Sequence, residues 1–152
     1  MHYSVRQFLI KEIEKRKLTV NRDTMREIAN ELRTTFGPSY IVEQLYLQAE
    51  KTGKDAIIES IRAVGEVKAL KKYPNFFLLA IDADQKRRYE RAISRGSETD
   101  HITREQFQAQ EQAEMNNSDE SKQNLSQCIQ LADLVIQNNG TIEQLYEQLK
   151  QI

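Results

Sequence analysis

Four arginines that follow the longest apolar run of the sequence have the type and spacing to bind a phosphate group. Arg87, Arg91 and Arg95 recur every four residues, so a helix aligns their guanidinium groups along one face. Arg88 adjoins this row, and each guanidinium group can bind two phosphate oxygens at once. Two interpretations stay open: a phosphate-binding row, or a solvated helix face whose arginines pair with carboxylates such as that of Glu90.

A strand directly before these arginines must position them. Residues 76–81 form an unbroken apolar run, too short to span a membrane and of the right length for a strand buried on both faces, as in parallel sheets. The run stops at Asp82, so the arginine helix begins at the carboxyl end of this strand. Open α/β sheets bind ligands at that end. We therefore expect the strand in the middle of a sheet and the arginines beside a ligand.

The remaining sequence predicts helices alternating with short strands. Ser4, Ser39 and Thr103 are typical helix caps, and Gln106 completes a capping box with Thr103. Besides 76–81, the expected strands are 55–60 and 134–136, with the end of another at 3–5; the expected helices include 4–16, one opening at 21–23, 40–51, 62–72, 103–114, 123–131 and 142–151. This order predicts an α/β domain with a mainly parallel sheet and a helix-rich first third as an insertion or cover.

Length and charge limit the class of protein. A chain of 152 residues predicts one domain. Its 22 basic and 23 acidic residues leave a net charge of -1, which argues against nucleic acid and membrane as partners, so any anion site is local. Cys128 is the only cysteine and excludes an internal disulfide, and two histidines far apart indicate no metal centre. Without a secretory leader or an apolar stretch of about 20 residues, the expected location is the cytoplasm.

Four segments match a known family. They are residues 57–62 (IIESIR), the strand end at Asp82, residues 91–95 (RAISR) and residues 132–141 (ADLVIQNNGT). Together the chain resembles the P-loop nucleotide kinases, specifically the dephospho-coenzyme A kinase and adenylate kinase-like group. The resemblance spans nearly the whole chain. It is most specific in 132–141, where alanine-aspartate, an apolar strand and Asn-x-Gly-Thr follow one another.

The resemblance implies a fold and an activity. The fold is α/β and three-layered, a parallel sheet flanked by helices, in a single domain over residues 1–152. A helical acceptor-side insertion falls on residues 22–52 and a small lid-like segment on residues 96–122. The implied activity is phosphoryl transfer from ATP to a nucleotide or dephospho-coenzyme A-like acceptor, with ATP and Mg²⁺ as cofactors.

The resemblance also assigns roles to single residues. It implies catalytic roles for Arg62, Arg91 and Arg95, substrate binding by Arg26, Arg33, Glu59 and Asp82, and nucleotide binding by Asn138 and Gly140, with no metal ligand. Arg91 and Arg95 fall against the bound nucleotide and its phosphates, and Arg62 falls on the acceptor phosphate. We expect these three arginines to converge on one cleft at the carboxyl ends of the strands.

One feature of the family is absent. Its phosphate-binding loop has the form G-x-x-x-x-G-K-[ST], and the only Gly-Lys pair here, Gly53-Lys54, is followed by Asp55. In the family this loop follows a central strand, so the chain resembles a kinase that begins one strand and one helix late and lacks the usual first central strand. We expect residues 56–59 to pair directly with 77–81, or a partner chain, as in a homo-oligomer, to supply the strand.

Three functions stay open. The first is an ATP-dependent kinase whose loop is missing from these 152 residues. The second is a non-catalytic nucleotide-binding, anion-binding or regulatory domain, and the third is an interaction domain whose arginines only pair with acids. Phosphoryl transfer depends on the loop amides, the loop lysine and a magnesium ion held by the loop hydroxyl. The 152 residues as written therefore favour the second function, with weak ATP binding and no transfer.

Overall fold

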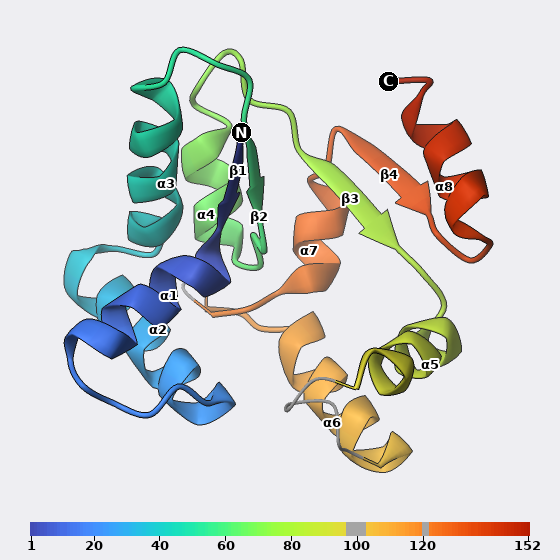
Figure 1. Cartoon of the computed structure of the whole chain (residues 1–152), viewed down its shortest axis with the longest axis horizontal. Coiled ribbons are helices and arrows are strands. Elements are labelled where there is room, and N and C mark those ends of the chain that lie inside the picture. The colour runs from blue at the N-terminus through green and yellow to red at the C-terminus, as the bar shows by residue number, and fades with distance from the viewer. Residues whose placement is uncertain (97–102, 120–121) are drawn as a thin grey trace.

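A computed structural model describes residues 1–96, 103–119 and 122–152 (Figure 1). These residues form eight helices and four strands, a mixed α/β arrangement as the sequence predicts. In chain order the elements are β1 (His2–Ser4), α1 (Val5–Lys15), α2 (Arg22–Phe36), α3 (Tyr40–Glu50), β2 (Ile57–Glu59), α4 (Val64–Leu70), β3 (Leu79–Asp82), α5 (Gln85–Arg95), α6 (Arg104–Met115), α7 (Leu125–Gln130), β4 (Leu134–Gln137) and α8 (Ile142–Leu149). Each described helix is too short or too polar to cross a membrane.

The strands form two separate parallel pairs. β1 pairs with β2, with Tyr3 opposite Ile58, and β3 pairs with β4, with Ala80 opposite Val135. In Figure 1 all four arrows run from top to bottom, and β2 and β3 are the inner strands of the two pairs. The expected direct pairing of residues 56–59 with 77–81 is therefore wrong.

A small core connects elements that adjoin the two strand pairs. Val67 of α4, Cys128 of α7 and Leu78, just before β3, form a buried cluster. The backbone N–H of Asn124 donates to the carbonyl of Arg62 at 2.9 Å, which ties the start of α7 to the segment after β2. The helices α4 and α7 thus connect the segment after β2 with the segment before β3.

The main core lies between the first helices and the β1–β2 pair. Val5, Leu9 and Ile13 recur at helical spacing in α1 and are buried. They pack with buried residues of α2, α3 and α4, and the cluster consists of Val5, Leu9, Ile13, Ile28, Ala29, Leu32, Ile41, Val42, Leu45 and Leu70. The helix-rich first third therefore supplies most of the main buried cluster, and α2 and α3 both lie within residues 22–52.

The strand in front of the arginine helix differs from its prediction. β3 begins at Leu79, so residues 76–78 precede it, and it has β4 as its single neighbour. Phe77 and Ile81 are 54% and 50% exposed. The prediction of a strand in the middle of a sheet, buried on both faces, is wrong for this structure because one edge of β3 has no adjoining strand among the described residues.

Helix starts follow the predicted polar residues, with two exceptions. Ser4 caps α1 and Thr103 caps α6 in a capping box, as expected. Ser39 makes no side-chain cap, and its hydroxyl instead donates to Glu43 at 3.1 Å. The helix expected over 62–72 is shorter, because α4 starts only at Val64. Of the lid-like segment 96–122, residues 97–102 and 120–121 lie outside the described part, and α6 is its main element.

Candidate functional site

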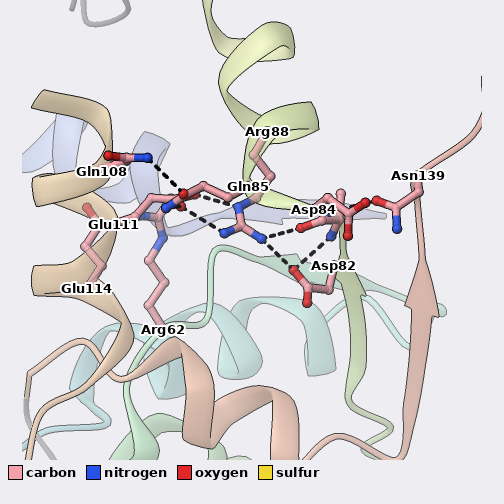
Figure 2. A network of polar contacts seen from close by, with 10 residues as sticks. Arg62, Asp82, Asp84, Gln85, Arg88, Gln108, Glu111, Glu114 and Asn139 are labelled. Carbon is pink, nitrogen blue, oxygen red and sulfur yellow. Dashed lines mark hydrogen bonds and ion pairs between the residues drawn. The ribbon is translucent and has the colours of Figure 1, made fainter. Parts of the chain in front are cut away.

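Arg88 of α5 is the centre of a polar network at the carboxyl end of β3 (Figure 2). Its Nη1 donates to Asp82 Oδ1 at 3.0 Å and to the carbonyl oxygen of Ala83. Its Nε and Nη2 donate to the two carboxylate oxygens of Glu111 on α6, at 2.5 and 2.8 Å. Hydrogen bonding to Glu111 raises the pKa of the half-buried Arg88, so the guanidinium group stays protonated.

A second arginine reaches α6 from the other strand pair. Arg62 follows β2, and its Nη1 donates to Glu114 Oε2 at 3.2 Å. Glu111 and Glu114 are three residues apart and therefore lie on one face of α6. Two carboxylates of α6 thus bind two arginines, one that follows β2 and one on α5 that contacts the end of β3 (Figure 2).

The network continues from α6 to the turn after β4. Gln85 of α5 donates to Glu111 at 3.1 Å and accepts a hydrogen bond from Gln108 of α6 at 3.2 Å. The backbone N–H of Asp84 donates to the side-chain oxygen of Asn139 at 2.7 Å. Figure 2 shows these groups in one row, with Arg88 between Glu111 and Asp82. The α5 helix start is therefore fixed on both sides by polar contacts.

Arg91 lies one turn further along α5 and contacts the β4–α8 turn. Its Nη1 donates to the carbonyl oxygen of Asn138 at 2.7 Å, and its Nη2 donates to the carbonyl oxygen of Gly140 at 3.1 Å. The structure thus brings the expected catalytic Arg91 together with both expected nucleotide-binding residues. Asn138 and Gly140 also line an open hollow of about 440 Å³ between this turn and α8.

Glu59 ends β2 and faces the first strand rather than the network. His2 Nε2 lies 3.4 Å from Glu59 Oε2. Hydrogen bonds from Ser4 and from His2 lower the pKa of Glu59. The two expected substrate-binding carboxylates therefore differ: Asp82 binds Arg88, and Glu59 binds groups of β1.

Arg33 of α2 is buried and already paired. Its side chain is 6% exposed and donates from Nη2 to Glu66 Oε1 at 2.7 Å, while Glu66 is 0% exposed. The other oxygen of Glu66 accepts the backbone N–H groups of Arg62 and Ala63 at 3.0 and 3.1 Å. Arg33 thus acts on the site through Glu66, which fixes the backbone of the segment that carries Arg62.

The expected catalytic residues Arg62 and Arg91 bind different partners. Arg62 binds Glu114, Arg91 binds the turn after β4, and Arg95 is exposed in the last turn of α5. Arg26 pairs with Asp23 on the exposed face of α2 at 2.8 Å. What the structure does bring together are arginines at the carboxyl ends of the strands and two carboxylates of α6.

Sequence reasoning missed three members of the network. Arg88 was recognised only as an adjoining residue of the row, although it makes the contact to Asp82. Glu111 and Glu114 belong to a helix that is hydrophilic almost throughout. Their three-residue spacing was a usable signal, since it places both carboxylates on one helix face.

The described residues offer no cradle for the cofactors that the resemblance implies. Gly53, of the only Gly-Lys pair, follows α3 with φ 61° and does not open a helix. Among the described residues no group of three or more His, Cys, Asp or Glu side chains is placed to hold a metal ion. The arginines fit phosphate oxygens, whereas Mg²⁺ finds no fitting ligand set in this part of the chain.

Comparison with curated proteins finds relatives described as UPF0200 proteins. One from Methanocaldococcus jannaschii is 31% identical over 144 residues, which cover 93% of this chain and 70% of the relative. One from Staphylothermus marinus is 29% identical over 127 residues, 84% of this chain and 64% of the relative. One from Pyrobaculum aerophilum is 27% identical over 154 aligned residues, 100% of this chain and 82% of the relative. No protein-family model matches the chain. The chain therefore spans less than two thirds of the length of the Staphylothermus marinus relative and more of the other two.

Proposed function

The chain belongs to the UPF0200 family, and from that premise we propose that it is a nucleotide kinase-like domain that binds a phosphate-bearing ligand and does not transfer phosphate by itself. The proposed ligand is a nucleotide or a dephospho-coenzyme A-like molecule, held through its phosphate groups. The proposal concerns these 152 residues; the activity of the longer relatives is a separate question.

One observation supports the proposal: three arginines from two segments, the loop after β2 and helix α5, lie at the carboxyl ends of the strands. Arg62 follows β2, Arg88 contacts the last residue of β3, and Arg91 contacts the residue after β4. In parallel α/β sheets this end of the strands is where ligands bind. Guanidinium groups fixed there suit phosphate oxygens, because each can make two charge-assisted hydrogen bonds.

The order of the strands supports a kinase-like sheet. The structure has two parallel pairs, β1–β2 and β3–β4, and the proposed fold treats them as the outer strands of a five-stranded parallel sheet. In the P-loop nucleotide kinases that the sequence resembles, the central strand carries the phosphate-binding loop. The proposed fold is thus the three-layer kinase fold without its first strand and helix.

The missing loop is the reason for proposing binding without transfer. Transfer of a phosphoryl group requires backbone amides, a lysine and a magnesium ion placed around the β and γ phosphates. The chain has no G-x-x-x-x-G-K-[ST] segment to supply them. Arginines alone hold an anion but leave the transition state without most of its stabilisation.

The two carboxylates of α6 compete with the proposed ligand for the arginines. Glu111 and Glu114 now occupy Arg88 and Arg62, so a phosphate group must displace them or share the guanidinium groups. Surface ion pairs contribute about 0–1 kcal/mol each, and these two pairs are only partly exposed, so displacing a carboxylate costs the ligand part of its binding free energy. We therefore expect weak binding that strengthens when a carboxylate of α6 is removed.

Isothermal titration tests the proposal with ATP, pyrophosphate and dephospho-coenzyme A, each with and without Mg²⁺. Arg88→Gln and Arg62→Gln should each weaken binding about tenfold, the value of a lost hydrogen bond to a charged group. Arg87→Gln is the matched control, because Arg87 lies on the same helix and pairs only locally with Glu90 in the contacts described here. Equal losses in all three variants would contradict the assignment.

Removing a carboxylate of α6 should strengthen ligand binding, whereas the arginine substitutions should weaken it. Glu111→Ala should tighten binding about fivefold, corresponding to about 1 kcal/mol for a half-exposed pair. Glu90→Ala removes the same charge from the neighbouring helix α5 and should change binding little. A coupled assay should find no turnover by the 152-residue chain, and measurable turnover would contradict the non-catalytic part of the proposal.

The ion pairs of Arg62 and Arg88 with α6 also favour a second function. If Arg62 and Arg88 serve only to fix α6, the chain is an interaction domain and the arginines are structural. Absence of binding for all three ligands, in the natural chain and in Glu111→Ala, would support that function. The titration therefore distinguishes the two.

A further inference from the structure

Helix α6 turns two carboxylates, rather than an apolar stripe, toward the rest of the chain. None of its described residues, Arg104–Met115, is buried. The side chains of Glu111 and Glu114 are nevertheless only 16% and 22% exposed. They point at the arginines of the site, Arg88 and Arg62 respectively (Figure 2). A surface helix normally packs through apolar side chains, so α6 is unusual in being attached through charges.

Neutral contacts accompany the two ion pairs. Phe107 of α6 packs edge-on against Tyr89 of α5, with ring centroids 5.4 Å apart. The side chain of Gln108 donates to Gln85 at 3.2 Å, between exposed groups that water can also bind. None of these side chains is buried. The ion pairs are therefore the contacts whose loss would most readily release α6.

The two carboxylates occupy the arginines as a linked pair of anionic groups. Glu111 accepts from Nε and Nη2 of Arg88, at 2.5 and 2.8 Å, which is the fork that a phosphate group uses. Glu114 accepts from Nη1 of Arg62 at 3.2 Å. Side chains three residues apart on a helix begin about 5–6 Å from each other. Two phosphate groups joined through one oxygen place their outer oxygens at a comparable spacing, so α6 presents the arginines with what a diphosphate would present.

This linkage makes the number of phosphate groups in a ligand important. A ligand with one phosphate group can displace only one carboxylate. The other ion pair then keeps α6 in place, so the displaced carboxylate stays near its arginine and competes at a high effective concentration. A ligand with two linked phosphate groups displaces both carboxylates together and ends this competition.

We propose that α6 is an internal inhibitor of the phosphate site: its Glu111–Glu114 pair disfavours ligands with a single phosphate group, and a diphosphate group displaces the pair and detaches the helix. This inference rests on the proposed phosphate binding and adds to it the class of ligand and the movement of α6. An isolated helix of 12 residues is only marginally stable in water. Detached α6 should therefore unfold in part, and its amide hydrogens should exchange faster.

Isothermal titration with pyrophosphate and with orthophosphate, at fixed ionic strength, tests the class of ligand. The natural chain should bind pyrophosphate at least tenfold more tightly, the value of a second hydrogen bond to a charged group. In Arg62→Gln and in Arg88→Gln this preference should fall below threefold, because one arginine of the pair remains. Arg87→Gln is the matched control, since it removes the same charge from α5, where Arg87 pairs with Glu90, and should keep the preference.

The outcomes of this titration separate the inference from the proposed function. A preference that survives the loss of Arg62 or Arg88, or equal binding of the two anions by the natural chain, overturns the inference and leaves the proposed phosphate binding intact. Binding of neither anion, by the natural chain or by Glu111→Ala, contradicts the proposed function itself and this inference with it.

Hydrogen exchange measured by mass spectrometry tests the movement of α6. Saturating pyrophosphate should speed exchange in α6 at least threefold, and orthophosphate should leave it unchanged. Helix α3 is the internal reference, because its buried residues Ile41, Val42 and Leu45 keep it in place. Exchange in α6 that slows or stays constant with pyrophosphate would overturn the inference, because the ligand would then bind while the helix remains attached.

A variant that combines Glu111→Gln with Glu114→Gln tests the attachment of α6 without any ligand. Its α6 should exchange about as fast as that of the natural chain with pyrophosphate, while α3 keeps its slow exchange. Glu105→Gln is the matched control, because it removes a carboxylate from the first turn of the same helix, beside the cap Thr103, and should have a much smaller effect. Exchange in α6 of the combined variant that stays as slow as in the natural chain would show that the carboxylates do not hold the helix, and would overturn the inference.

Discussion

The two halves of the chain bury their apolar residues to different extents. In the described part of the chain, the main buried cluster lies wholly within residues 5–70, where α1–α4 pack on one another. In the second half, Ile81, Val135 and Ile142 are exposed although they belong to strands β3 and β4 and to helix α8. Figure 1 shows the same contrast, with β3, β4 and α8 standing to one side of the packed helices. Both halves expose some large apolar side chains, but only the first half contains the main buried cluster of the described chain.

The charged pairs differ in the same way. The Arg33–Glu66 pair of the first half is buried, and both oxygens of Glu66 are bound. The Arg88–Glu111 pair of the second half is half-buried and connects two helices at the surface. Removing one partner of a buried pair strongly destabilises the folded protein, because the other charge stays buried without a counter-charge. A surface pair can exchange partners at little cost in free energy. The first pair therefore serves the fold, and the second is suited to ligand exchange.

Glu66→Ala is the largest test of this contrast. It leaves the Arg33 guanidinium buried without a partner and frees the N–H groups of Arg62 and Ala63. The free energy of unfolding should fall by about 3–5 kcal/mol, as for other broken buried pairs. Urea unfolding followed by circular dichroism measures the change.

Glu31→Ala is the control for that test. Glu31 lies on α2 and binds Arg16 Nη1 at 2.8 Å, but both side chains are at the surface. Its loss should cost about 1 kcal/mol or less. Comparable losses in Glu66→Ala and Glu31→Ala would remove the distinction between a fold pair and a surface pair.

The same isoleucine-to-alanine change in each half compares how much stability a buried and an exposed side chain contribute. Ile41 on α3 is fully buried, and its truncation in Ile41→Ala should cost about 2–5 kcal/mol, including the cavity that it leaves. Ile81→Ala should cost much less, because half of that side chain already contacts water. Equal losses in urea unfolding would show that β3 is covered in solution and that the halves do not differ.

Much of the fold followed from the sequence, because local patterns determine it. The apolar spacing of α1 and the capping box of Thr103 were both enough to predict helices that the structure contains. The pairing of strands was not predictable in the same way. Apolar runs such as 76–81 indicate a strand, but the neighbours of that strand are distant in sequence and depend on how the whole chain packs.

The site was harder to predict than the elements around it. Arg88 and Arg91 could be placed on one helix face from their spacing. Their partners could not, since Glu111 and Asn138 lie more than 20 positions away and reach them only through the packing of α6 and β4. The burial of Arg33 was missed for the same reason, because a long-range carboxylate decides whether an arginine faces a ligand or the core.

Asp133 offers the smallest and most specific test of how the second half is held together. Its carboxylate accepts hydrogen bonds from Lys71 Nζ at 2.6 Å and from the backbone N–H of Leu78 at 2.7 Å. Asp133 therefore connects the start of β4 to the segment before β3. The hydrogen bond from Lys71, followed by that from Leu78, lowers the pKa of Asp133 in the folded chain. The unfolded chain therefore takes up the proton first as the pH falls. The stabilisation is complete above the unfolded pKa, near 3.8, and is lost as the pH falls through the lower folded value.

Asp133→Asn should consequently be less stable than the natural chain at pH 7, and the difference should shrink as the pH falls below about 4. The asparagine can still accept the N–H of Leu78 but loses the charge that binds Lys71. Urea unfolding at steps from pH 7 to pH 3 measures the difference. Glu147→Gln serves as the control, since it removes an exposed pair of the same length, 2.6 Å to Lys150, from α8 and should have little effect. A difference between Asp133→Asn and the natural chain that stays constant down to pH 3 would mean that the charge of Asp133 does not stabilise the joint between β3 and β4.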